Sequence, residues 1–224
     1  MFSIMAEVIT NHWQTLLRGL GVTLQLTLAS VVIGFFLGIL LALGRVYGNR
    51  LIYGICTVIV EVIRGTPLLV QLFILYYGLP AYGIRLGAVA SAIIAFSINS
   101  GAYQAEYLRG SIQSLEKNQM LAARSIGMTR PQAIALIVLS QAFRRVIPAW
   151  TNEFIYLLKY TSLAYIVGAP ELMGVAKIIG SRIYFYFEVY LIVAFIYLAV
   201  VIVFTKIFDI VEKKFKIPGL ETIR

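Results

Sequence analysis

Charged residues are scarce in this 224-residue chain, which also contains only one cysteine and one histidine. Charged residues make up 13% of the sequence and hydrophobic residues 60%, whereas about 25% of the residues in a soluble domain are charged. This composition excludes an ordinary soluble domain and indicates a membrane protein. The single cysteine, Cys56, cannot form an intrachain disulfide.

Motifs that would support catalysis are also absent. The sequence has no GxxxxGK[ST] phosphate-binding loop, no cluster of metal ligands and no serine placed to cooperate with its one histidine. We therefore expect no cofactor in this chain and no enzymatic activity of its own. The net charge of +9 is compatible with nucleic-acid binding. However, the positive residues are dispersed between apolar blocks and form no basic face with interleaved aromatic residues, so no nucleic acid is expected.

Five apolar segments are each long enough to cross a bilayer whose hydrocarbon core is about 30 Å thick. In residues 1–18, which precede them, apolar side chains recur at three- and four-residue steps, a pattern typical of an amphipathic helix in the membrane interface. Gly34 and Gly38 have the GxxxG spacing that allows close helix packing. We predict an all-α membrane protein with a single transmembrane domain over residues 1–224. The approximate spans are 19–44, 51–78, 86–107, 146–168 and 187–208.

The distribution of lysine and arginine predicts the orientation of the chain. Most of these residues fall between the first and second spans, between the third and fourth spans, and after the fifth. Loops rich in lysine and arginine remain in the cytoplasm. With five spans, the two ends lie on opposite sides of the membrane. We expect the N-terminus outside and the C-terminus in the cytoplasm.

The second span is unusual because it contains charged residues and helix breakers. Glu61 and Arg64 lie near its centre, and Gly65, Thr66 and Pro67 follow. Charged side chains within a bilayer are costly, so these two should contact each other, as their i,i+3 spacing allows, or face a polar cavity. The sequence therefore predicts an intramembrane charge pair, Glu61 with Arg64. Its role is either helix packing or a polar path.

Residues 110–145 form a polar segment between two apolar blocks, and two short helices are predicted in it. The first covers 118–126 and ends at Gly127, because glycine closes a helix in the left-handed conformation without steric penalty. The second begins at Thr129, which forms a capping box with Gln132. We interpret the segment as a docking platform for a soluble cytoplasmic partner. An interfacial linker resting on lipid headgroups is the alternative.

Several motifs resemble those of the permease subunits of polar amino-acid ABC importers, the histidine/glutamine permease family. The sequence EVIRGTPLLVQLF at 61–73 resembles the family signature, and AYQAEYLRG at 102–110 resembles the stretch before the cytoplasmic loop. In the loop, LAA at 121–123, glycine at 127 and IVL at 137–139 resemble the pattern EAA–G–I-x-L-P. The resemblance extends over nearly the whole chain.

The chain departs from this family at three positions. Leu121 replaces the glutamate that usually begins the loop pattern, and Ser140 replaces the proline that usually ends it. Tyr160 replaces the aspartate that usually follows the lysine at 159. Because that glutamate is thought to contact the ATPase in related transporters, docking is expected here to depend on shape and apolar contacts.

The resemblance implies a type I ABC importer permease in the inner membrane of a prokaryote. Such subunits pair with a second permease, either identical or a sister chain, and bind two cytoplasmic ATPase subunits, which hold ATP and Mg²⁺. An extracytoplasmic binding protein delivers the amino acid. The residues implied in ATPase coupling are Leu121, Ala122, Ala123, Gly127, Met128 and Thr129.

An amino-acid site is expected near the membrane midplane among the second, third and fourth spans. Glu153 is the first candidate to bind a cationic group, because a glutamate within the membrane is a functional-site hypothesis by default. Tyr156 and Tyr160 follow it and could stack on a guanidinium. Candidates for the carboxylate and other polar contacts are Asn99, Ser100, Tyr103, Gln104 and Thr57.

This set of residues favours a basic amino acid (arginine, lysine or histidine) as the substrate, and glutamine is the alternative. Glu153 could instead form a structural salt bridge with Arg64 or Lys159. Two other classes of function remain open at this point: a secondary transporter or channel, and a structural membrane scaffold. The absence of an inverted repeat with two broken helices weakens the first, and the buried polar residues have no purpose in the second.

Overall fold

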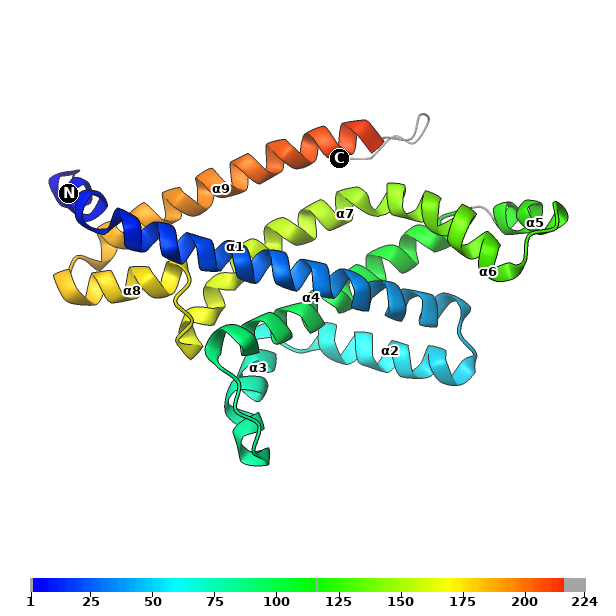
Figure 1. Ribbon diagram of the computed structural model, residues 1–224, viewed down its shortest axis with the longest axis horizontal. Helices are drawn as coiled ribbons and strands as arrows, with labels where there is room; N and C mark the ends of the chain where they lie inside the picture. Colours follow the sequence, from blue (N-terminus) through cyan, green and yellow to red (C-terminus); the bar gives the residue numbers. More distant parts are fainter. Residues whose placement is uncertain (1, 116, 216–224) are drawn as a thin grey trace.

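The computed structural model describes residues 2–115 and 117–215, and almost all of these residues are helical (Figure 1). Nine α-helices are joined by short turns and by two π-helical and two 3₁₀ segments within the described residues. The π-helical segments are Ile74–Gly78 and Ala133–Val138, and the 3₁₀ segments are Leu79–Tyr82 and Thr161–Val167. The α-helices are α1 Phe2–Tyr47, α2 Arg50–Gly65, α3 Leu68–Phe73, α4 Ala88–Gln113, α5 Lys117–Ser125, α6 Arg130–Gln132, α7 Leu139–Tyr160, α8 Leu172–Ile183 and α9 Tyr186–Phe215.

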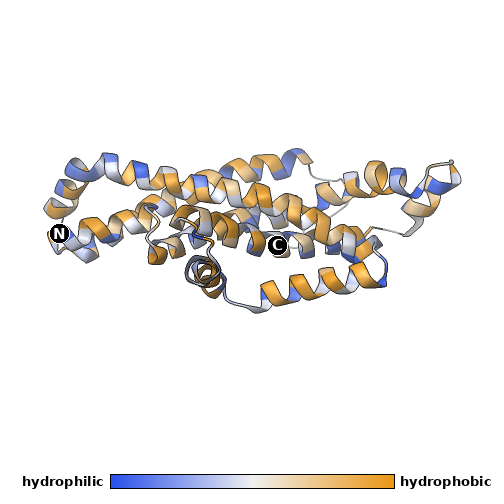
Figure 2. Cartoon of the chain, turned by 60° about the horizontal axis from the view of Figure 1, so that its bottom comes forward, coloured by the Kyte–Doolittle hydropathy of each residue, from blue (hydrophilic) through white to orange (hydrophobic). Residues whose placement is uncertain are grey.

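Three helical stretches in the described residues are long and apolar enough to cross a membrane: Ser3–Tyr47, Arg130–Val167 and Tyr186–Phe215. The segments Arg50–Gly65 and Leu68–Tyr82 pass the same test as a bent pair. Helix α4 is more polar, but its 26 residues give it a length of roughly 39 Å. Apolar residues dominate the middle of the long helices, and hydrophilic residues gather toward their ends (Figure 2). The predicted all-α membrane fold is confirmed.

Helix α1 lies along α4, and small residues bring the two backbones together (Figure 1). A Cβ atom added to Gly34 would lie 3.0 Å from the backbone nitrogen of Gly101. One added to Gly38 would lie 3.1 Å from the Gly101 carbonyl oxygen. Few real side chains make contacts this short, so glycine is needed at these positions. The close packing predicted from the GxxxG spacing is confirmed.

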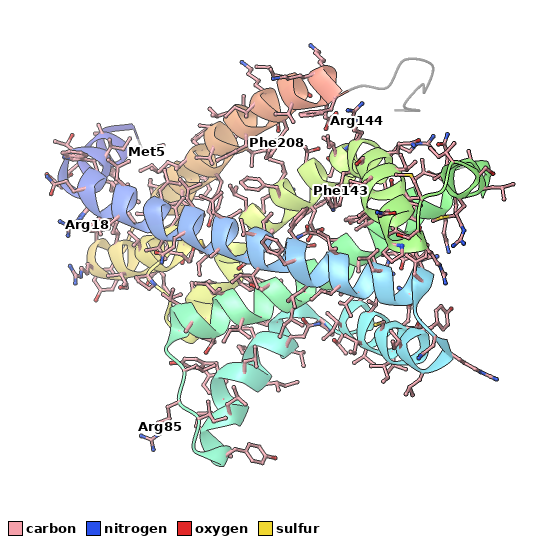
Figure 3. All side chains as sticks on the ribbon, turned by 45° about the vertical axis from the view of Figure 1, so that its right-hand side comes forward. Met5, Arg18, Arg85, Phe143, Arg144 and Phe208 are labelled. Atoms are coloured by element: carbon pink, nitrogen blue, oxygen red, sulfur yellow. The ribbon has the colours of Figure 1, made fainter. Side chains whose placement is uncertain are left out.

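The predicted second span, 51–78, is not one straight helix. It bends by 104° between α2 and the helical segment that begins at Leu68, because Thr66 and Pro67 adopt extended backbone conformations. The Gln71 side chain satisfies the carbonyl groups freed at this break, with Nε2 donating to the carbonyl oxygens of Ile63 at 2.7 Å and Thr66 at 3.1 Å. After the break, α3 packs against α4 through the buried Leu72. The helical segment that follows it projects away from the bundle, with Arg85 near its far end (Figures 1 and 3).

Two helices extend further than predicted. The amphipathic segment 1–18 is not a separate interfacial helix where it is described, since α1 continues through it into the first span. Val8 and Leu16 are buried against α8 and α9, and this packing supports the continuous helix. The second helix of the 110–145 segment is likewise not short. Helical structure continues from Arg130 into α7.

The sequence did not predict a helix between the fourth and fifth spans, but α8 lies there. Glu171 caps it, and its carboxylate accepts hydrogen bonds from the backbone nitrogens of Met173 at 2.9 Å and Gly174 at 2.7 Å. The Tyr197 hydroxyl donates to the same carboxylate at 3.0 Å. The buried Glu171 therefore joins α8 to α9 and serves as a structural residue.

On α7, Phe143 packs inside the helical bundle, whereas the next residue, Arg144, lies on its surface. The Phe143 ring packs with its centroid 5.7 Å from that of Trp150 and 6.1 Å from that of Phe35 on α1. Its neighbour Arg144 is exposed and points outward (Figure 3). The aromatic cluster holds α7 against α1 and sets the position of the more distal part of α7, which contains Glu153.

Candidate functional site

Glu153 is a buried carboxylate between α7 and α4. The residue is 7% exposed, and its side chain faces the hydroxyl groups of Ser100 and Tyr107 on α4. Among the described residues, it forms no salt bridge. Both cations proposed as its structural partners lie elsewhere. Arg64 approaches Glu106, and the Lys159 ammonium lies 4.7 Å from the centroid of the Tyr156 ring. Neither of the two salt bridges considered for Glu153 is therefore formed in the described residues.

Three of the predicted polar site residues on α4 are buried: Asn99, Ser100 and Gln104. The side-chain amides of Asn99 and Gln104 already make hydrogen bonds. Asn99 Nδ2 donates to Gln71 Oε1 at 3.1 Å, which ties α4 to the break after α2. Gln104 Nε2 donates to the Val31 carbonyl oxygen at 3.2 Å and to Ser100 Oγ at 3.0 Å. Asn99 and Gln104 thus stabilise helix packing, while Ser100 also faces Glu153.

The aromatic candidates divide between α4 and α7. Tyr103 lies under the guanidinium of Arg64, with 5.2 Å from Cζ to the ring centroid. Tyr156 and Tyr160 are 52% and 50% exposed, and Tyr156 already lies beside the Lys159 ammonium. Only Tyr103 therefore lies among the buried polar groups of α4.

Thr57 is separated from the other candidates by its position on α2. Its hydroxyl oxygen is buried and has no hydrogen-bond partner in the described part of the chain. It lies one helical turn before Glu61, which belongs to a different cluster of charges.

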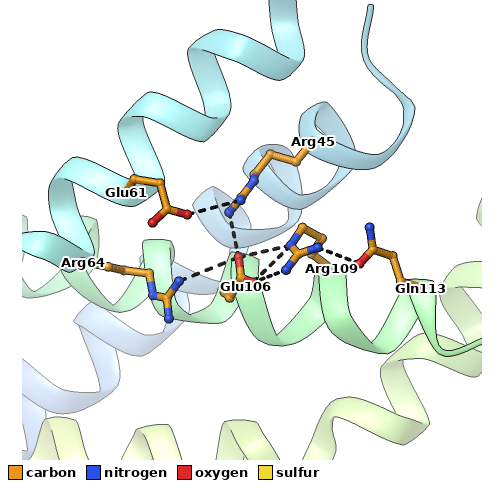
Figure 4. A network of polar contacts seen from close by, with 6 residues as sticks. All are labelled: Arg45, Glu61, Arg64, Glu106, Arg109 and Gln113. Carbon is orange, nitrogen blue, oxygen red and sulfur yellow. Dashed lines mark hydrogen bonds and ion pairs between the residues drawn. The ribbon is translucent and has the colours of Figure 1, made fainter. Parts of the chain in front are cut away.

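That cluster joins α1, α2 and α4 through Glu106 (Figure 4). Glu106 Oε2 accepts a hydrogen bond from Arg45 Nη1 at 2.7 Å and lies 3.8 Å from Arg64 Nη1. Arg109, one turn further along α4, also pairs with Glu106. Arg109 Nε donates to Glu106 Oε2 at 3.1 Å.

The predicted pair between Glu61 and Arg64 is not formed in the described residues. Glu61 Oε1 instead lies 3.3 Å from Arg45 Nη2 on α1, and its side chain is 59% exposed. Arg64 turns toward Glu106 and Tyr103 on α4. The i,i+3 spacing would permit the pair, but packing against α1 and α4 supplies other partners for both side chains.

The loop between α5 and α6 has the geometry that the sequence predicts. Gly127 has a φ angle of +89°. Its N–H donates to the Arg124 carbonyl at 3.1 Å, and the Met128 N–H donates to that of Ala123 at 3.2 Å, the two bonds of a Schellman motif. The Thr129 N–H donates to Gln132 Oε1 at 2.9 Å. The predicted glycine stop and capping box are confirmed.

This turn presents apolar side chains to its surroundings. Leu121 is 67% and Ile126 is 79% exposed, while Ala123 is buried. Ala122 is also exposed and Met128 is partly so. An exposed apolar surface on a rigid turn is suited to protein contact, and Leu121 contributes to it where the resemblance leads one to expect glutamate.

Sequence reasoning missed Arg45, Glu106 and Tyr107 as members of these clusters. Arg45 and Glu106 lie at the ends of predicted spans, where charges are common and carry little signal. Tyr107 lies one turn after Tyr103, and this i,i+4 spacing places both on one face of α4. Since Tyr103 was already a candidate, this spacing could have identified Tyr107 as a further one.

Comparisons with known proteins identify the family. Residues 34–217 match the family described as "Binding-protein-dependent transport system inner membrane component". The chain belongs to this family. It is 40% identical over 205 residues to the L-cystine transport system permease protein TcyB of Bacillus subtilis, covering 91% of this chain and 88% of that protein. It is 36% identical over 202 residues to the arginine transport system permease protein ArtQ of the same organism, covering 90% and 92%.

A solved structure described as an amino acid ABC transporter with histidines matches with a TM-score of 0.86 and 38% identity. The match covers 92% of this chain and 96% of that one. These relatives establish the chain as a permease subunit of the amino-acid ABC transporter type, with the type I importer fold, in the inner membrane. Such subunits are not enzymes. Family membership also implies ATPase, binding-protein and sister-permease partners.

Proposed function

We propose that this subunit carries a basic amino acid across the inner membrane and binds its cationic group at Glu153. The observation that supports this specificity is a carboxylate that is 7% exposed and has no cationic partner among the described residues. A buried, unpaired carboxylate is strongly unfavourable, so a cationic substrate would supply the missing charge. Ser100 and Tyr107, which the carboxylate faces, keep it oriented when the site is empty.

In the permease pair, each of the two cytoplasmic ATPase subunits would dock on the Gly127 turn of one permease. The exposed side chains of Leu121 and Ile126 support this position. Ala122, Met128 and Thr129 would complete the contact. ATP and Mg²⁺ would bind to the ATPases, whose closure would move α5 and α6 and switch the permease pair between inward-facing and outward-facing states. Because helical structure continues from α6 into α7, this movement would reach Glu153 directly.

The proposed orientation places the N-terminus outside and the C-terminus in the cytoplasm, following the distribution of lysine and arginine. The binding protein would then deliver the amino acid at the opposite end of the bundle from the Gly127 turn. The second permease would be an identical or a sister chain.

Uptake by proteoliposomes tests the specificity. The complete transporter, with its ATPase and binding protein, is supplied with arginine, lysine, histidine, glutamine and glutamate, using wild type and Glu153→Gln. ATP-dependent accumulation of a basic amino acid, lost in Glu153→Gln, is the expected result. Tyr156→Phe is the matched control on the same helix, because the Tyr156 ring is exposed and already contacts the Lys159 ammonium. Its uptake should match that of wild type.

Preference for glutamine or another neutral amino acid, with Glu153→Gln silent, would show that Glu153 is structural and would leave a permease of different specificity. Uptake without ATP would contradict ATP-driven transport itself. Relatives named for L-cystine transport and for arginine transport match the chain at comparable identity. The substrate must therefore be identified by the uptake experiment.

A further inference from the structure

Arg64 has hydrogen-bonding capacity that the described residues do not use. Its closest carboxylate oxygen, Glu106 Oε2, lies 3.8 Å from Nη1, which is too long for a hydrogen bond. Its Nε is buried and has no hydrogen-bond partner in the part of the chain that the structure describes. Glu106 is already hydrogen-bonded to Arg45 at 2.7 Å and to Arg109. Arg64 is therefore the least satisfied of the three arginines around Glu106 (Figure 4).

The guanidinium lies instead over an aromatic surface on α4. Its Cζ is 5.2 Å from the centroid of the Tyr103 ring, and the Tyr103 and Tyr107 centroids are 6.5 Å apart. Tyr107 is close enough to interact electrostatically with both Arg64 and Glu153. The Arg64 guanidinium on α2 and the Glu153 carboxylate on α7 thus lie near the same pair of tyrosine rings on α4.

The two side-chain amides predicted to hold a substrate carboxylate are already engaged. Both N–H groups of the Gln104 amide are used, by the Val31 carbonyl and the Ser100 hydroxyl. The Asn99 amide donates to Gln71 at the break after α2. Recruiting either amide would disrupt helix packing, whereas Arg64 could bind an anion without losing a hydrogen bond.

We infer that Arg64 binds the α-carboxylate of the transported amino acid, with Tyr103 positioning its guanidinium and Glu153 on the other side binding the cationic group. The inference rests on the proposed function, because it assigns the second half of the same site. A free amino acid carries both charges, and a guanidinium can bind a carboxylate through two parallel hydrogen bonds. Arg64 also directly precedes the Gly65–Pro67 break, so carboxylate binding would act on the junction between α2 and α3.

Equilibrium binding of radiolabelled arginine and argininamide to the purified permease–ATPase complex in detergent tests this role. Argininamide lacks the carboxylate but keeps the guanidinium. The binding protein is left out, because it would discriminate between the two ligands itself. The variants are Arg64→Gln, Arg64→Lys, Glu153→Gln and, as the matched control, Arg109→Gln, which removes another arginine beside Glu106 but none from the Tyr103 ring.

Arg64→Gln should weaken arginine binding at least about tenfold, since hydrogen bonds between charged groups are among the strongest in proteins. It should leave argininamide binding unchanged, so that the wild-type preference for arginine disappears. Arg64→Lys keeps the charge but loses the planar guanidinium, so its affinity for arginine should lie between those of wild type and Arg64→Gln. If Arg64→Gln does not assemble with the ATPase, Arg64→Lys replaces it in the test. Arg109→Gln should bind both ligands like wild type.

Equal weakening for both ligands in Arg64→Gln, or no weakening, would overturn the carboxylate role. If Glu153→Gln loses arginine binding while Arg64→Gln keeps it, only the Arg64 assignment fails. If wild type does not bind arginine, or Glu153→Gln binds it normally, the proposed function fails, and the inference fails with it.

Discussion

Glu106 and Glu153 are two carboxylates that both contact α4, and their surroundings are opposite. Glu106 is hydrogen-bonded to Arg45 and Arg109 and has Arg64 nearby, whereas Glu153 faces only hydroxyl groups and is more deeply buried. The first carboxylate is satisfied by the protein and joins three helices. The second has no counter-charge within residues 2–115 and 117–215. The comparison shows that an ionisable residue within a membrane bundle becomes a candidate for substrate binding when its own protein does not neutralise it.

Glu106→Gln should have the largest effect on stability. Breaking a buried ion pair by removing one partner costs about 3–5 kcal/mol, and here three arginines would lose their shared carboxylate. Because the Glu106 side chain is 20% exposed, we expect the lower end of this range. Thermal unfolding of the purified transporter in detergent measures the loss. An unchanged unfolding temperature would show that the cluster does not hold α1, α2 and α4 together.

Gly38→Val should have the next largest effect on stability. It should disturb the surroundings of Glu106 and leave those of Glu153 unchanged. A side chain there would press on Gln104 and Ala105 of α4, and overpacking of this kind costs about 1–3 kcal/mol. The shift would affect the contact between α1 and α4, and so Arg45 and Glu106, but not the contact between α4 and α7. A lower unfolding temperature with unchanged selectivity among amino acids is expected.

Gly21→Val is the matched control for this prediction. No atom beyond its immediate neighbours lies within 4 Å of a Cβ at Gly21. The variant should unfold at the wild-type temperature. Equal unfolding temperatures for Gly21→Val and Gly38→Val would show that the close approach to α4 does not make glycine necessary at position 38.

Glu61→Gln should have a small effect. Its side chain is 59% exposed and 3.3 Å from Arg45, and exposed ion pairs contribute about 0–1 kcal/mol. The unfolding temperature should fall slightly or not at all. A loss as large as that of Glu106→Gln would mean that Glu61 is the main partner of Arg45.

Glu153→Gln should have the smallest effect on stability. A glutamine at this position can still hydrogen-bond to Ser100 and Tyr107. The substitution also removes a buried charge that has no ion-pair partner in the described part of the chain. The unfolding temperature should stay the same or rise while transport of the basic amino acid is lost. Marked destabilisation would show that the carboxylate has a structural role.

The features that could be predicted from the sequence are those set by local chemistry. The apolar segments, the close approach at Gly34 and Gly38, the helix end at Gly127 and the capping box at Thr129 each depend on a few neighbouring residues. The family motifs were also sufficient to identify the type of transporter, which the comparisons confirm.

Features that depend on tertiary partners could not be predicted. Glu61 and Arg64 have suitable spacing for a pair, but their actual partners are Arg45 on α1 and Glu106 on α4. The continuity of α1 depends on packing of Val8 and Leu16 against α8 and α9. Glu153 is buried in the structure, but only the arrangement of the cations shows that none in the described residues pairs with it.

A structure of the complete transporter with bound arginine, determined by electron cryomicroscopy, would test the role of Glu153 most directly. We expect a cationic nitrogen of the ligand between α4 and α7, at about 2.7–2.9 Å from the Glu153 carboxylate, the usual distance for a charged hydrogen bond. Arginine bound elsewhere, with Glu153 paired to a cation of the protein, would contradict it.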